Sequence, residues 1–214
     1  MSPPRLGPIL AFLFICFISA LSAGPLAAQN KVPLQENLGE AAKEYKRGAD
    51  AYSRGDYLAA LAEWQPLAEQ GYTDAQNNLG YIFANGLGVK QDYAEASKWY
   101  RLSAQAGDAS GQHNLGVIYA MGLGVPQDFA EALKWYRRSA EQGYVEAVRS
   151  LGVTYYHGRG IPKDNVESYK WFHIAAELGH PTAGQSRDLV ARELTAAQRA
   201  KAQEMARAWL VARR

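Results

Sequence analysis

Hydrophobic and polar positions repeat along this chain with a period of thirty-six residues. The triplet Asn78-Leu79-Gly80 returns as Asn114-Leu115-Gly116 and again as Ser150-Leu151-Gly152. An aromatic pair and a later glycine recur with the same step: Trp99-Tyr100, Trp135-Tyr136 and Trp171-Phe172, then Gly107, Gly143 and Gly179. A fixed period of this size is typical of a solenoid, in which each unit buries its apolar face only against its neighbours. The pattern predicts an all-α chain of stacked helix pairs, which offers an extended binding surface rather than a catalytic pocket.

Each full unit is predicted to contain two helices joined by a glycine-rich loop. The first, helix A, should begin near Ala75, Gly111 and Ala147. Glycines such as Gly86 and Gly88 can close its C-cap and allow a tight turn before helix B. A phosphate-binding Gly-x-Gly loop would need a preceding strand and a lysine–serine signature, and the sequence has neither.

An acidic pair marks the start of each predicted helix B. The pairs are Asp92 with Glu95, Asp128 with Glu131, and Asp164 with Glu167. An N-cap aspartate with glutamate three residues later is the capping-box arrangement, with aspartate replacing the usual serine or threonine. Because the carboxylates recur at one phase, we interpret them as helix starts and not as catalytic acid–base pairs.

The recurring apolar positions predict the core. Leu79, Leu115 and Leu151 should be buried on helix A, and the glycine after each leucine should let a facing helix approach closely. The tryptophan-led aromatic pairs are expected to supply the bulky core partners, since aromatic residues at this spacing are core residues in most cases.

The repeated unit resembles the Sel-one-like repeat, a relative of the tetratricopeptide repeat with a longer loop between its two helices. The resemblance rests on Ala75, Leu79-Gly80, the Gly-x-Gly-Val loop, Asp92, Ala96, Trp99-Tyr100 and Gly107. Residues 45–74 look like a more tetratricopeptide-like first unit, although Trp64 precedes Gly71 by one residue fewer than Trp99 precedes Gly107. The resemblance implies a right-handed solenoid of antiparallel helix pairs with scaffolding or signalling roles.

The sequence also predicts how the chain is divided. The expected segments are a signal peptide at 1–28, a linker at 29–40, a repeat domain at 41–182 and C-terminal capping helices at 183–214. The repeat domain should comprise a degenerate unit at about 41–74 and full units at 75–110, 111–146 and 147–182. In the last segment Thr195 and Gln198 form a helix start. Its excess of basic residues is either a solvated face or a docking surface for acidic partners or anionic lipid heads.

The N-terminus has the pattern of a secretory signal peptide: Arg5, an apolar run from 9 to 21, then small residues up to Ala28. We expect cleavage after Ala28, with a cut after Ser22 as the alternative. Left uncleaved, the stretch from Ile9 to Ala28 just reaches the roughly 20 residues of a membrane span and could anchor the protein in the inner membrane. The protein is therefore expected in the periplasm or outside the cell. Cys16 is the only cysteine, so the mature chain would carry no thiol.

Composition and charge exclude some classes of function. Hydrophobic residues make up 48% of the chain, and 23 basic against 21 acidic side chains leave a net charge of +2. This balance shows no general footprint for nucleic-acid binding. The four histidines fall at positions that vary between units, and no hydrolase elbow or zinc-protease motif is present. No catalytic, cofactor or metal site is therefore predicted.

In the tetratricopeptide relatives helix A lines the concave face, so the resemblance places a partner-binding groove there. The predicted groove residues are Tyr45, Tyr52, Asn77, Tyr81, Asn85, His113, Val117, Arg149, Tyr156 and His157. Their chemistry suits a protein or peptide partner. We expect a monomeric, non-enzymatic adaptor, scaffold or regulator of a cell-envelope protein. The alternatives are a hydrolase acting on cell-wall or β-lactam compounds, as claimed for cysteine-bearing relatives, and a secreted host-directed factor.

Overall fold

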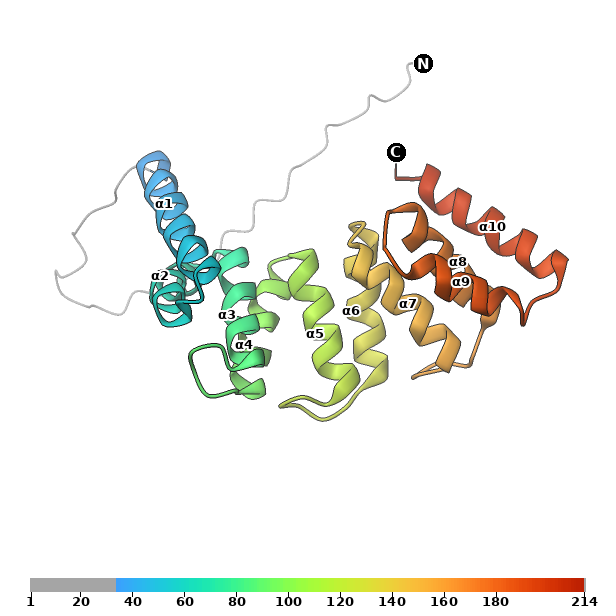
Figure 1. The fold of residues 1–214 in the computed structure, drawn as a ribbon, viewed down its shortest axis with the longest axis horizontal. Helices are drawn as coiled ribbons and strands as arrows, with labels where there is room; N and C mark the ends of the chain where they lie inside the picture. The colour runs from blue at the N-terminus through green and yellow to red at the C-terminus, as the bar shows by residue number, and fades with distance from the viewer. Residues whose placement is uncertain (1–33, 214) are drawn as a thin grey trace, which may run out of the picture.

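The computed structural model describes residues 34–213, which form ten helices and no strand. The helices are α1 Leu34–Ser53, α2 Tyr57–Glu69, α3 Thr73–Asn85, α4 Tyr93–Gln105, α5 Ala109–Met121, α6 Phe129–Glu141, α7 Val145–His157, α8 Asn165–Glu177, α9 Ala183–Ala191 and α10 Ala196–Val211. Consecutive helices pack against each other in a row (Figure 1), and α10 returns to pack on α8. The predicted solenoid of helix pairs is confirmed. None of the helices in the described part of the chain is long and apolar enough to cross a membrane.

The odd-numbered helices α1, α3, α5 and α7 are here called A-helices, and their partners α2, α4, α6 and α8 are called B-helices. The full units begin two residues before the predicted starts, at Thr73, Ala109 and Val145. Tyr72 and Tyr144 occupy the N-cap positions of α3 and α7 with extended backbone and no side-chain capping bond. Two of the three starts therefore carry no sequence signal of the usual capping kind.

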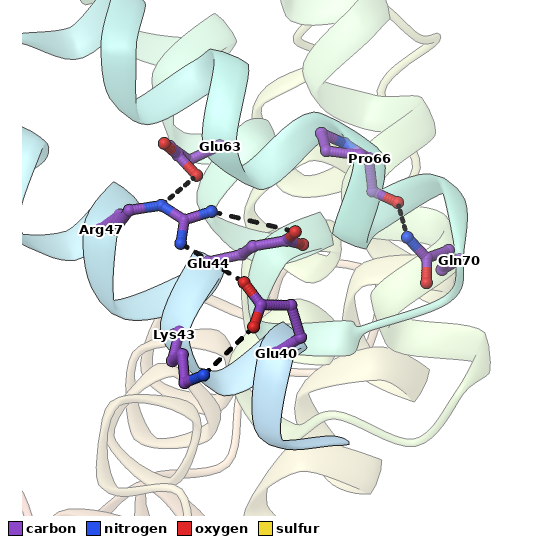
Figure 2. Close-up of polar contacts among 7 residues, drawn as sticks. All are labelled: Glu40, Lys43, Glu44, Arg47, Glu63, Pro66 and Gln70. Atoms are coloured by element: carbon purple, nitrogen blue, oxygen red, sulfur yellow. Dashed lines mark hydrogen bonds and ion pairs between the residues drawn. The ribbon is translucent and has the colours of Figure 1, made fainter. Parts of the chain in front are cut away.

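The linker predicted at 29–40 is wrong over its second part, because α1 already begins at Leu34. Residues 34–36 are leucine, glutamine and glutamate, which are good helix formers and extend a helix without needing a periodic apolar face. Figure 2 shows an ion-pair network at the exposed surface of α1, in which Arg47 reaches Glu40 and Glu44. Arg47 Nε also lies 3.0 Å from a Glu63 oxygen on α2. Such exposed pairs each contribute at most about 1 kcal/mol.

The long loops between A- and B-helices are closed by backbone bonds. Gly86 ends α3 in the left-handed conformation at φ 64°, and its N–H donates to the Ile82 carbonyl. The Asp92 N–H then donates to the Phe83 carbonyl over 2.9 Å, which brings the start of α4 back beside the end of α3. The same bond recurs in the next two units, so the three loops share one conformation.

The predicted aspartate N-caps are present, but the full capping box is not formed at these three sites. Each aspartate accepts a bond from the backbone N–H three residues on, as Asp92 does from Glu95. The glutamate side chain, however, pairs with a lysine one turn further along, as Glu95 does with Lys98 over 2.6 Å. The glutamate carboxylate therefore binds the lysine ammonium group and not the backbone N–H of the N-cap residue. At α10, where Gln198 cannot form an ion pair, both bonds of the box with Thr195 are present.

The central packing contact sets an aromatic ring of a B-helix on a glycine of its A-helix. Tyr100, Tyr136 and Phe172 are buried, and a Cβ atom added to Gly80, Gly116 or Gly152 would lie 2.6–2.7 Å from their rings. The glycines therefore allow the close approach that the sequence predicted.

Each aromatic pair was expected to supply core partners, but only the second residue of each pair is fully buried. Trp99, Trp135 and Trp171 are half-buried. Adjacent positions on a helix point about 100° apart, so when the second residue of each pair faces its own A-helix, the tryptophan turns to the seam between units. Trp135 packs against the cluster around Tyr100 and Leu115, and the Arg138 guanidinium lies 4.7 Å from its ring centre.

The first unit, formed by α1 and α2, also sets an aromatic ring on a glycine, but the loop between its two helices is shorter. The Trp64 ring covers Gly48, with no room for a Cβ atom there, and the indole Nε1–H donates to the Tyr45 carbonyl over 3.1 Å. Trp64 thus corresponds to Tyr100, thirty-six residues later, and not to Trp99. This removes the apparent one-residue deficit before Gly71. The α1–α2 loop is shorter than the α3–α4 loop, which gives this unit its tetratricopeptide-like length.

We predict that Gly116→Ala lowers the free energy of unfolding by ~1–3 kcal/mol, because the new methyl group collides with the Tyr136 ring in a packed core. Gly184→Ala is the matched control, since nothing lies within 4 Å of a Cβ atom at that helical glycine. The control should leave stability unchanged or raise it by up to about 1 kcal/mol. Urea unfolding followed by circular dichroism measures both, and equal effects would contradict the proposed role of the glycine.

Candidate functional site

The A-helices are joined to one another by a ladder of polar contacts. Asn78 Nδ2 on α3 donates to the Tyr45 hydroxyl on α1 over 3.1 Å. Asn114 Nδ2 on α5 donates to Asn77 Oδ1 on α3 over 2.9 Å. His113 on α5 reaches Ser150 on α7, with 3.2 Å between Nε2 and Oγ. Each contact links equivalent positions of successive units, so the ladder fixes how neighbouring A-helices sit side by side.

Three hollows of this row lie between α1 and α3, between α5 and α7, and between α7 and α9, and each is lined by an aromatic ring that covers a glycine. Their linings come from equivalent positions, because Trp64, Tyr136 and Phe172 each line one hollow. We call the surface that contains them the A-helix face. What differs between the three hollows is the chemistry of the side chains around the ring.

The aromatic hollow lies between α1 and α3 and has a volume of about 340 Å³. Its lining is neutral and consists of Tyr45, Ala49, Tyr52, Trp64, Asn77, Asn78 and Tyr81. The Tyr52 ring packs 5.7 Å from Trp64 and 6.4 Å from Tyr81, centre to centre. Tyr81 is 46% exposed, so the hollow presents aromatic surface and amide groups to solvent.

The basic hollow lies between α5 and α7 and has a volume of about 90 Å³. Its lining comprises Arg149, Arg159, Ser150, Thr154, Val153, Ala120, Phe129, Ala132 and Tyr136. Arg149 Nε is buried and has no hydrogen-bond partner within residues 34–213. A buried donor without a partner costs about 1–3 kcal/mol, so this arginine is held at a cost to folding.

The apolar hollow lies between α7 and α9 and has a volume of about 170 Å³. It is lined by Val153, Tyr156, His157, Phe172, Ser186, Leu189 and Val190. Tyr156 is held in place because its hydroxyl donates to Glu193 over 3.0 Å. The Glu193 carboxylate also accepts bonds from Lys163 and Asn165, and these hydrogen bonds lower its pKa.

The predicted groove residues are distributed unevenly over these hollows. Tyr45, Tyr52, Asn77 and Tyr81 meet in the aromatic hollow, Arg149 lines the basic one, and Tyr156 and His157 line the apolar one. Three others line none of the three hollows. Asn85 donates to the Tyr81 carbonyl at the end of α3, His113 belongs to the ladder, and Val117 packs against the core.

The residues of the A-helix face that sequence reasoning missed include Arg159 and Leu189. Arg159 lies in a glycine-rich loop where the other full units have Leu87 and Leu123, a departure that could have drawn attention. Leu189 lies in α9, thirty-six residues after Val153, so α9 continues the A-helix pattern beyond the last predicted unit. The period would have found Leu189 had it been followed past residue 182.

A larger hollow of about 440 Å³ lies on another part of the molecule, between the ends of α6 and α8 and helix α10. Arg213 lines it and lies over the Trp209 ring at 3.8 Å, and its Nε donates to the Glu141 carbonyl over 3.4 Å. The chain's own cation thus already covers the aromatic surface here. Within residues 34–213 no group of three or more potential metal ligands gathers in one place.

Ser150 and His113 are the one nucleophile and base that meet on the described part of the A-helix face. The Ser150 hydroxyl donates to the Glu146 carbonyl over 2.8 Å, so the imidazole must be the donor in its contact with Ser150. His113 Nδ1 is buried and has no partner among the described residues. A serine nucleophile needs its proton directed at the base and the base oriented by a third group. This pair has neither and is a structural rung.

Comparison with known proteins gives a family match. The model of the Sel1 repeat matches residues 73–108, 109–144 and 145–180, in phase with the observed helix starts. The solved structure of c5321, a protective antigen present in uropathogenic Escherichia coli strains and displaying an SLR fold, is 30% identical with a TM-score of 0.75. A Sel1 repeat protein from Oxalobacter formigenes is 34% identical with a TM-score of 0.63.

These matches cover 86% and 68% of this chain, which in turn covers 42% of c5321 and 58% of the Oxalobacter protein. The chain therefore spans about half the length of either relative. No curated protein matches the chain.

Burial is the main electrostatic influence on His113. Burial lowers the pKa of the imidazole, an effect that the neighbouring Asn114 side chain and the charge of Glu146 oppose and that the charge of Arg149 reinforces. The folded protein therefore holds this imidazole neutral more firmly than the unfolded chain does. Acidification below about pH 6.5 should favour the unfolded chain, because the unfolded imidazole binds the proton first.

We predict that His113→Asn reduces the loss of stability between about pH 7.5 and about pH 5.5. Asparagine occupies the equivalent position, residue 77, where it makes the same kind of ladder contact. Urea unfolding at the two pH values measures the change. Some pH dependence should remain, because burial also lowers the pKa of His173. The exposed His157→Asn serves as control, and an equal reduction in both variants would assign the effect to something other than His113.

Proposed function

This chain belongs to the Sel1 repeat family, and from that premise we propose that it is a non-catalytic adaptor, scaffold or regulator whose protein partner docks on the A-helix face. Sel1 repeats generally mediate protein–protein binding. The assignment of the surface, the partner class and the cellular location is our proposal.

The observation that carries the proposal is the variation of one hollow along the A-helix face. The aromatic ring and the glycine beneath it recur in every unit, whereas the residue at the position of Asn77 becomes His113 and then Arg149. A row of equivalent hollows with different linings can read successive residues of a partner. Solenoids generally use their extended faces in this way.

The exposed side chains of this face are of the kind that anchor interfaces. Tyrosine and arginine are enriched among the residues that contribute most to binding, and Tyr81 and Arg149 line two of the hollows. In the apolar hollow Leu189 is 59% exposed, so a partner would bury it on docking. The rigid cores below keep these groups in place before the partner arrives, which limits the entropy lost on binding.

We further propose that the protein is exported and that its partner belongs to the cell envelope. Arg5, the apolar run and the small residues up to Ala28 support this location, and they lie outside the described residues. The similarity to a protective antigen of uropathogenic Escherichia coli also favours a protein that leaves the cytoplasm. The same similarity is consistent with the alternative proposal that the protein is a secreted, host-directed factor that uses the same binding surface.

We predict that the double variant Tyr81→Ala, Leu189→Ala loses capture of the envelope partner, because it removes anchors from two hollows. Both side chains are largely exposed, at 46% and 59%, so the melting temperature should hardly change. The measurement is a pull-down from envelope extract with identification of the captured protein by mass spectrometry, followed by titration of that protein once purified.

The matched control is Leu58→Ala, Leu102→Ala, which removes two side chains with nearly the same exposure, 60% and 45%, from the B-helices α2 and α4. This control should capture the partner as wild type does. If both double variants bind equally well, the A-helix face is not the docking surface.

We predict that the mature protein begins at Gln29 when it is isolated from the cells that produce it. Intact-mass measurement on separated cytoplasmic, periplasmic and membrane fractions gives the answer directly. A mature form that begins at Ala23 would support the alternative cut after Ser22. A full-length protein in the cytoplasmic fraction would contradict export.

A further inference from the structure

Two guanidinium groups share the basic hollow without a counter-charge. Arg149 comes from α7 and Arg159 from the loop that follows it, and both line the hollow of about 90 Å³. Within residues 34–213 neither guanidinium forms an ion pair. The Arg159 guanidinium lies 5.9 Å from the centre of the Phe129 ring, and Arg149 Nε is buried without a hydrogen-bond partner among these residues. Two like charges beside each other repel, and an anion between them would remove the repulsion and satisfy the buried donor.

The surrounding side chains do not supply that anion. Glu146 precedes Arg149 by three residues on α7 and is the acidic residue of that helix. The Glu146 carboxylate is held by His180, with 3.1 Å between Oε2 and Nε2. The only other titratable group in the lining is Tyr136, whose pKa burial raises to about 12, so it remains neutral. No acidic side chain lines the hollow, so we infer that an anion that fills it comes from outside residues 34–213.

The size and lining of the hollow favour a small anion on an apolar stem. Its volume of about 90 Å³ leaves room for a group of only a few heavy atoms. Phe129, Val153 and Tyr136 provide apolar walls, against which a methylene group can pack. Guanidinium groups match the geometry of a carboxylate through paired hydrogen bonds. An aspartate or glutamate side chain meets all of these requirements.

The basic hollow has the apolar hollow as its direct neighbour, and Val153 lines both. Successive packed helices lie about 10 Å apart, and an extended chain advances about 3.3 Å per residue. A partner segment that follows the A-helix row therefore moves from one hollow to the next in about three residues.

We propose that the A-helix face binds an extended peptide segment of a partner protein in which an acidic residue enters the basic hollow and a bulky apolar residue, about three positions away, enters the apolar hollow. The inference rests on the proposed function and names the partner class for the same surface. Arg149 and Arg159 read the acid, while Leu189 and Phe172 contact the apolar side chain.

The test uses the full chain and two fluorescent peptides in which Glu-Ser-Gly-Leu or its reverse is flanked by glycine and serine. Fluorescence anisotropy should show saturable binding of one of the two orders, weakened by added salt. Peptides with glutamine for glutamate, or with alanine for leucine, should bind at least about tenfold more weakly. Failure of both peptides to bind would overturn the proposal.

Variants of the protein locate the contact. Arg149→Gln and Arg159→Gln should each weaken peptide binding by about tenfold or more, whereas Arg138→Gln, which removes the same charge from the B-helix α6, should not. Because Arg149 is partly buried, circular dichroism is used to check that each variant is folded. If Arg149→Gln unfolds, the binding measured for the exposed Arg159→Gln variant decides the test. Arg159→Glu should prefer the peptide with lysine in place of glutamate. Equal binding by Arg159→Gln and wild type would contradict the assignment.

Competition of the peptide with inorganic phosphate and with acetate tests whether the basic hollow prefers a phosphate or a carboxylate. Displacement of the peptide by phosphate at a lower concentration than by acetate would overturn the choice of a carboxylate. The outcome is separable from that of the proposed function. If Arg159→Gln still captures the envelope partner while Tyr81→Ala, Leu189→Ala does not, this inference fails and the A-helix face remains the docking surface.

Discussion

The contact between an aromatic ring and a glycine determines the rest of this structure. Tyr100, Tyr136 and Phe172 each lie on a glycine of the partner helix, and Trp64 does so in the first unit. Each ring closes its helix pair, and three of them, Trp64, Tyr136 and Phe172, also line a surface hollow. Core and binding surface therefore share a residue. A unit can change the walls of its hollow freely, but a change of the ring also loosens its helix pair.

The sequence was sufficient for the architecture because the period carries most of the information. Recurring leucines, glycines and aspartates specify helix pairs regardless of detail, and the match of observed helices to this pattern is close. The sequence did not show which residue of each aromatic pair is fully buried. Which of two adjacent aromatic residues faces the core depends on how the helix is rotated about its axis. The thirty-six-residue period gives the repeat length but not this rotation. The same one-residue ambiguity concealed the equivalence of Trp64 and Tyr100.

The candidate site was less accessible to sequence reasoning. Tyr45, Tyr52 and Tyr81 share a hollow because α1 and α3 lie side by side. The sequence analysis anticipated this when it placed the binding groove on the first helix of each unit. Asn85 and His113 also lie on first helices, but their side chains form hydrogen bonds with neighbouring residues and line none of the three hollows. Arg159 reaches the surface from a loop, where helical phase gives no direction. Pairing a loop residue with a helix residue requires the loop conformation, and two positive-φ glycines, Gly158 and Gly160, set that conformation here.

The placement of the tryptophans has a consequence for how the molecule can be observed. Trp99 packs against the first-unit cluster, Trp135 against the next, and Trp171 lies edge-on to Trp209 at the C-terminal end. Each joint of the array thus carries its own intrinsic fluorophore, partly open to solvent. In a one-dimensional array the joints can open separately, from the ends inward. The chain contains five tryptophans, so single-tryptophan forms would report the fraying of individual joints without any added label.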